Sequence, residues 1–170
     1  MPVSTQRAVA VYQIHPAVLS VGILAGLLLQ TLLPLKIPLA RLMDFPLLVL
    51  IYFALIWRDR MYGMGLGTCL GLLQDALSHG YIGIFGIAKA VSGYLAASAS
   101  TRFELESLLG RAVLTGVLVL AHNVLVYGLQ RLLLEAPQPF QPLATASAVL
   151  MNVALGLIIF QVFDRFRRPA

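Results

Sequence analysis

The chain has 170 residues, of which 59% are hydrophobic and 11% are charged, and its mean hydropathy is +0.88. A soluble globular domain carries about 45–50% apolar and about 25% charged residues, so the composition excludes a water-soluble enzyme. It also excludes intrinsic disorder, which needs low hydrophobicity and high charge. The net charge is +5, but the basic residues lie between apolar runs, so we expect contacts with anionic membrane lipids and no nucleic acid.

Six stretches approach the length of about 20 mostly apolar residues that a membrane helix needs. We predict an all-α integral membrane protein, a compact bundle of about six transmembrane helices forming one domain over residues 1–170. Its expected spans are about 16–33, 42–57, 61–78, 81–100, 112–134 and 143–163. Pro16 and Pro34 bracket the first span, because proline suits a first helical turn and tends to end a later one. The second span is the weakest, since its apolar core is short.

The basic residues predict the orientation of these spans. Six crossings place both termini on one side of the membrane. If that side is the cytoplasm, eight of the twelve lysine and arginine residues lie inside, three lie outside, and Lys89 lies within the fourth span. Because cytoplasmic loops carry an excess of basic residues, this asymmetry predicts that both termini are cytoplasmic.

Small residues recur at helical spacing in the third and fourth spans. Gly63, Gly67 and Gly71 follow one another at intervals of four residues, which places them on one helix face. Gly86 and Gly93 lie on the fourth span among alanines and serines. Such faces let two helices approach closely. The partner is either another helix of this chain or a helix of another protein, and these five glycines are our candidate packing or partner face.

The same four-residue spacing continues to Asp75 and His79, and Lys89 follows on the next span. A carboxylate inside a membrane is costly, so Asp75 should face protein or a polar pocket. We consider Asp75, His79 and Lys89 a candidate buried polar group that, with backbone donors near Gly80 and Gly83, fixes the helix hairpin. A surface for a partner or ligand and an ion relay are alternatives, and the relay would require further acids at mid-depth.

Patterns typical of enzymes were sought in the same way. The sequence has no GxSxG, HExxH or GxxxxGK[ST] motif. The single cysteine, Cys69, permits no internal disulfide, and no cysteine or histidine cluster indicates a metal site. We therefore expect no catalytic residues, no metal and no cofactor.

The segment from Gly71 to Gly83, GLLQDALSHGYIG, resembles the signature of the rod shape-determining MreD family. That family shows a G-L-x-x-D-x-[LF]-S-x-G-x-x-G stretch at the turn between two membrane helices, followed by a helix rich in small residues. The matching residues here are Gly71, Asp75, Ser78, Gly80 and Gly83. His79 and Lys89 are not typical of the pattern, so a pairing of Asp75 with Lys89 does not follow from it.

The resemblance implies a non-enzymatic scaffold subunit of the cell-elongation complex in the bacterial cytoplasmic membrane. Its partners would be MreC, MreB, RodA and a class B penicillin-binding transpeptidase, and it would help to organise lateral peptidoglycan synthesis and rod shape. Our leading hypothesis is that small-residue helix faces bind MreC while Asp75 fixes the outer hairpin. MreD is also similar in fold to the S components of energy-coupling-factor transporters, so a vitamin-binding subunit is the alternative. The short outer loops, poor in polar groups, favour the scaffold.

Overall fold

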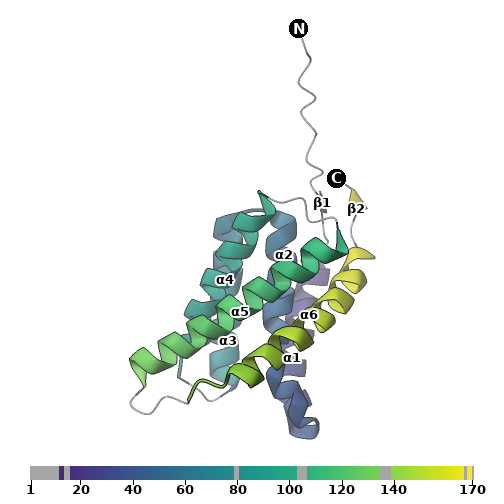
Figure 1. The fold of residues 1–170 in the computed structure, drawn as a ribbon. Coiled ribbons are helices and arrows are strands. Elements are labelled where there is room, and N and C mark those ends of the chain that lie inside the picture. The colour runs from purple at the N-terminus through teal and green to yellow at the C-terminus, as the bar shows by residue number, and fades with distance from the viewer. Residues whose placement is uncertain are drawn as a thin grey trace.

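The computed structural model describes residues 12–13, 16–78, 81–102, 107–134, 139–166 and 168–169, and within them the chain is almost entirely helical (Figure 1). The six α-helices are α1 (Pro16–Lys36), α2 (Phe45–Trp57), α3 (Arg60–Leu77), α4 (Ile84–Ser100), α5 (Leu108–Leu133) and α6 (Pro142–Asp164). A short 3₁₀-helix, η1 (Pro38–Leu42), connects α1 to α2. Strands β1 (Tyr12–Gln13) and β2 (Arg168–Pro169) pair antiparallel, so residues 12–13 lie beside residues 168–169. The predicted all-α bundle is confirmed.

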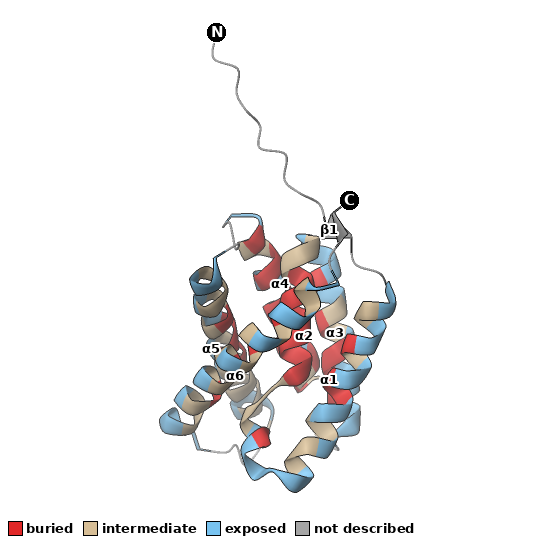
Figure 2. Ribbon diagram, turned by 90° about the vertical axis from the view of Figure 1, so that its right-hand side faces the viewer, coloured by how far each residue is buried: buried red, intermediate tan, exposed pale blue. Residues whose placement is uncertain are grey.

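Helix α2 lies at the centre and contacts each of the other five helices. Every residue from Phe45 to Ala54 is buried, and Figure 2 shows this helix as a buried column among more exposed ones. Its position explains its length: 13 residues rise only about 20 Å, less than a bilayer core. A helix surrounded by protein does not have to match the membrane thickness. The weak second span of the sequence is therefore the core of the fold.

Polarity in the bundle is the inverse of that in a soluble protein. Many large apolar side chains face outward, among them Leu24, Leu32, Val117, Leu150 and Ile158. The side chains that are polar and buried include Gln74, Asp75, Lys89, Ser92, His122 and Asn152. An outer surface this apolar is stable only when lipid or protein covers it. Helices α1, α5 and α6 are long and apolar enough to cross a membrane, whereas α2 and α4 are shorter apolar helices.

Several helix boundaries differ from the predicted ones, and three of these differences have local reasons. Helix α1 continues through Pro34 to Lys36, because a proline in the last turn interrupts little of the helix that follows. Helix α4 begins at Ile84 instead of about residue 81, since Gly83 adopts a left-handed conformation with φ 108°. Helix α5 begins earlier than expected because the Ser107 hydroxyl accepts a hydrogen bond from the backbone N–H of Gly110, at 3.0 Å.

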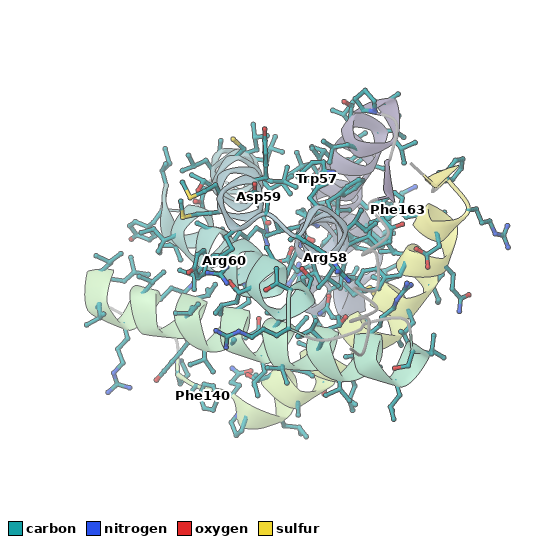
Figure 3. All side chains as sticks on the ribbon, turned by 90° about the horizontal axis from the view of Figure 1, so that it is seen from above. Trp57, Arg58, Asp59, Arg60, Phe140 and Phe163 are labelled. Atoms are coloured by element: carbon teal, nitrogen blue, oxygen red, sulfur yellow. The ribbon has the colours of Figure 1, made fainter. Side chains whose placement is uncertain are left out.

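The end of the bundle near the chain termini is held by side chains from three helices. Asp164 of α6 accepts hydrogen bonds from the Tyr52 hydroxyl of α2, at 3.0 Å, and from the guanidinium of Arg111 at the start of α5. Figure 3 looks down on this end and labels the turn between α2 and α3. There Asp59 begins α3 by accepting hydrogen bonds from the backbone N–H groups of its first turn.

Candidate functional site

The carboxylate of Asp75, near the end of α3, holds the start of α4. Asp75 is 1% exposed. Its Oδ2 accepts hydrogen bonds from the backbone N–H of Gly83 at 2.8 Å and of Gly86 at 3.2 Å, and its Oδ1 accepts one from Phe85 at 3.2 Å. The first N–H groups of a helix lack intrahelical partners and carry partial positive charge, which a carboxylate stabilises. Asp75 thus closes the α3–α4 hairpin.

Replacement of Asp75 by asparagine is expected to lower the free energy of unfolding by about 2–3 kcal/mol. Hydrogen bonds to a charged group contribute about 1.5–3 kcal/mol each, and asparagine keeps one acceptor oxygen but points an NH₂ group at the other donors. Thermal unfolding of the purified chain in detergent measures the loss. Asp75→Ala, which removes all three bonds, should lower stability further. A melting temperature equal to wild type for both variants would contradict this role.

A second carboxylate, that of the partly buried Asp44, lies between η1 and α2 and forms the centre of a polar cluster. Its Oδ1 accepts a hydrogen bond from the backbone N–H of Leu47 at 2.9 Å and so caps α2. Its Oδ2 accepts a hydrogen bond from the ammonium of Lys89, whose side chain is fully buried on α4. The Nε2 atom of His122, on α5, lies 3.4 Å from the same oxygen.

The pairing of Lys89 corrects the sequence prediction. The sequence left Lys89 and His79 as candidate partners of Asp75, whereas the structure places the ammonium of Lys89 on Asp44. The physical reason is that the backbone of α4 already supplies Asp75 with three donors, while Asp44 reaches the middle of α4 from the neighbouring α2. His79 and Gly80 lie outside the described residues. Asp44 was missed, although an acid before Phe45-Pro46 is typical of a helix N-cap.

Amide side chains extend the Asp44 cluster to two more helices. The backbone N–H of Asp44 donates to Oδ1 of Asn152 at 2.8 Å, and Nδ2 of Asn152 donates to the carbonyl of Leu42 at 2.8 Å. The N–H of Phe45 donates to Oε1 of Gln30, on α1, at 3.1 Å. Contacts from α1, α4, α5 and α6 therefore converge on the junction of η1 and α2. In a dry interior such groups are stable only when paired, so this network fixes the central helix in position.

The glycine stripe of α3 lies against the backbone of α4. A Cβ atom at Gly63 would lie 2.6 Å from the carbonyl oxygen of Gly93. One at Gly67 would overlap the carbonyl of Lys89, and one at Gly71 would overlap that of Phe85. Each step of four residues along α3 matches a step of four back along α4, so the helices pack antiparallel in register. Of the two interpretations that the sequence left open, the structure shows packing within the chain.

This packing corrects the hypothesis that the stripe binds a partner. Gly63, Gly67 and Gly71 are buried, and their face is occupied by α4. On α4, Gly93 is likewise placed against the carbonyl of Gly63, and a Cβ at Gly86 would lie 3.0 Å from the side chain of Leu72. Among the motif residues, Ser78 ends α3 and its hydroxyl donates to the carbonyl of Gln74.

Two polar cavities adjoin the Asp44 cluster at the end of the bundle away from the termini. The first, of about 290 Å³, lies between η1, α5 and α6 and includes Asp44 and Asn152 in its wall. The second, of about 280 Å³, lies between α1 and the end of α3. Gln30, Gln74 and Phe85 belong to the walls of both. A third space, an apolar groove of about 450 Å³, runs between α1 and α6 and is lined by Val21, Ala25 and other apolar residues.

The site has the character of a packing and binding site. Among the described residues, no group of three or more His, Cys, Asp or Glu side chains is placed to hold a metal ion. The ionisable groups Asp75, Asp44 and Lys89 are each engaged in contacts that position helices. What the arrangement offers is an apolar outer surface, a groove and two small polar cavities.

The fold and its polar interior define a helical membrane protein. A family model described as rod shape-determining protein MreD matches residues 13–168. The chain therefore belongs to the MreD family, a family of shape-determining structural membrane proteins, and has a role in determining rod shape. Comparison with curated proteins and with solved structures gives no match. The expected similarity to transporter S components thus stays a prediction.

Proposed function

We propose that the protein is a non-enzymatic membrane subunit of the cell-elongation complex, which binds MreC and helps to organise lateral peptidoglycan synthesis. The observation that carries this proposal is the family match, which extends over all six helices of the bundle. MreB, RodA and a class B penicillin-binding transpeptidase are the further members of the complex in this proposal.

The contacts of the polar groups inside the bundle support the proposal that the protein is a scaffold. Asp75 closes a hairpin, and Asp44 and Lys89 hold the central helix, so each contributes to the shape of the bundle. The rigid core presents an outer surface of apolar side chains to its surroundings. A scaffold protein acts through the molecules that its surface binds.

The proposed orientation places both termini in the cytoplasm. The pairing of β1 with β2 supports an even number of crossings, because it brings residues 12–13 beside residues 168–169. Arg58 and Arg102 lie in turns, and Arg60 lies at the start of α3. All three are at the end of the bundle where β1 and β2 pair, which agrees with the excess of basic residues on the cytoplasmic side. In this orientation the two polar cavities lie in the outer half of the membrane.

Because the glycine stripe is covered, we propose that MreC contacts the outward-facing apolar surface, with the groove between α1 and α6 as its first candidate position. Fourteen residues line this groove, all of them apolar or glycine, and a helix that packs there would bury them. Ala25→Trp fills the groove from an exposed position on α1. We expect it to reduce the recovery of MreC by at least about fivefold, the equivalent of ~1 kcal/mol.

Co-purification of MreC with the tagged protein from detergent-solubilised membranes measures this recovery. Val117→Trp, at an exposed position on α5, is the matched control and should leave the recovery unchanged. Absence of MreC from the wild-type preparation would refute binding, and equal recovery with both variants would exclude the groove. Depletion of the protein in its rod-shaped host, with rounding as the expected result, tests the role in cell shape independently.

A further inference from the structure

The two polar cavities adjoin each other and together make up one polar region of the bundle. They share Gln30, Gln74 and Phe85, and together they extend from α1 across α3 and α4 to α5 and α6. Asn123, Tyr127 and Gln130 of α5 also line the larger cavity, at a spacing that places them on one helix face. These two amides and the phenol are polar groups on one side of a membrane helix, so they need polar groups next to them. The cavity provides space for such groups.

The side chain of Gln74 indicates that the described wall of the cavity lacks a hydrogen-bond donor for its amide oxygen. Gln74 is 6% exposed, and its Oε1 has no hydrogen-bond partner among the described residues. A buried acceptor without a donor is costly, and buried polar atoms in proteins are nearly always paired with protein, water or ligand. Oε1 of Gln30, on the shared wall, already accepts from Phe45, which leaves the amide NH₂ of Gln30 as a donor. The shared wall therefore contains a buried acceptor without a partner, from Gln74, and an amide donor, from Gln30.

The charge in the wall is positive. The carboxylate of Asp44 is paired with Lys89, so the two charges compensate each other. Arg41 of η1 is exposed and also lines the larger cavity. Ala144 and Thr145, in the first turn of α6, also line this cavity. The N-cap residue Gln141 forms no side-chain cap, so the partial positive charge of this helix start is not compensated there.

We propose that this region binds a phosphate-bearing polyol, whose hydroxyl group donates to Oε1 of Gln74 while its phosphate lies against Arg41 and the start of α6. The hydroxyl satisfies the unpaired acceptor, and the anion complements the arginine and the helix start. Two sources carry this chemistry: the headgroup of an anionic phospholipid such as phosphatidylglycerol, and a soluble phosphate such as glycerol 3-phosphate. The proposal does not depend on the binding of MreC.

The experiment uses the full chain, purified in detergent and supplied with phosphatidylglycerol, phosphatidylcholine or glycerol 3-phosphate. Native mass spectrometry measures the bound fraction, and thermal unfolding measures the stabilisation. Selective binding of phosphatidylglycerol identifies a lipid headgroup, and binding of glycerol 3-phosphate identifies a soluble ligand. If neither binds better than phosphatidylcholine, the cavity holds water only and the proposal is overturned.

Two variants test the residues that carry the proposal. Gln74→Leu and Arg41→Gln should each weaken binding by about tenfold, which corresponds to ~1.4 kcal/mol. Gln161→Leu on α6 and Arg102→Gln after α4, both at exposed positions, are matched controls and should leave binding unchanged. Gln74→Leu should also raise the melting temperature of the ligand-free protein, because it removes an unpaired buried acceptor.

A purely structural role for Gln74 would give the opposite result for the ligand-free protein, a lower melting temperature, together with unchanged binding. Arg41→Gln changes an exposed side chain, so it provides the same test if Gln74→Leu does not fold. Equal loss of binding in Arg41→Gln and Arg102→Gln would show that the lipid is held only by general surface charge, and would also overturn the proposal.

Discussion

Replacement of Lys89 by methionine is expected to lower the free energy of unfolding by about 3–5 kcal/mol, the cost typical of breaking a buried ion pair by removing one partner. Lys89 is 0% exposed, and its ammonium donates to Asp44. Methionine preserves most of the volume of the side chain but leaves the carboxylate without its cation. Thermal unfolding in detergent, followed by the fluorescence of Trp57, measures the change.

Two further variants separate the ion pair from other effects of the substitution. Lys36→Met removes an exposed lysine at the end of α1 and should leave the melting temperature unchanged. Asp44→Asn combined with Lys89→Met should recover part of the lost stability, because it removes the unpaired charge while keeping an acceptor for the N–H of Leu47. If Lys89→Met unfolds like wild type, the pair does not hold α2 in place.

Features that depend on residues close in sequence could be predicted. The apolar stretches gave six helices, and the spacing of four residues identified the glycine face of α3. Asp75 and its three backbone donors lie within eleven residues of one another, so the hairpin could be inferred from the motif alone. Local spacing carries this information because neighbouring helices joined by a short turn have few ways to pack.

Features that depend on contacts between helices distant in sequence could not be predicted. Asp44 and Lys89 are 45 residues apart, and their contact requires α2 to lie beside the middle of α4. The residues of α2 do not indicate that position, because the core of this helix is uniformly apolar and shows no preferred face. The cavities beside Gln74 likewise arise from three or more helices at once. Hydropathy alone does not predict that α2 is buried on all sides.

Gly67→Ala is expected to destabilise the isolated protein by about 3 kcal/mol or more, at the upper end of the cost of overpacking. The added methyl group would overlap the carbonyl of Lys89, which belongs to the backbone of α4 and cannot move as a side chain can. The two helices would have to separate along their whole interface, and the contacts of Gly63 and Gly71 would be lost with them. Thermal unfolding of the purified chain again measures the effect.

Gly65→Ala is the matched control on the same helix. A Cβ at Gly65 meets nothing within 4 Å, so alanine should leave stability unchanged or raise it by up to about 1 kcal/mol through its better helix propensity. A stripe that served mainly to bind a partner would give a different result: Gly67→Ala would unfold normally alone and lose only the complex. Because the glycines face α4, we expect the isolated chain itself to fail, and loss of MreC in that variant would then report folding and not a contact surface.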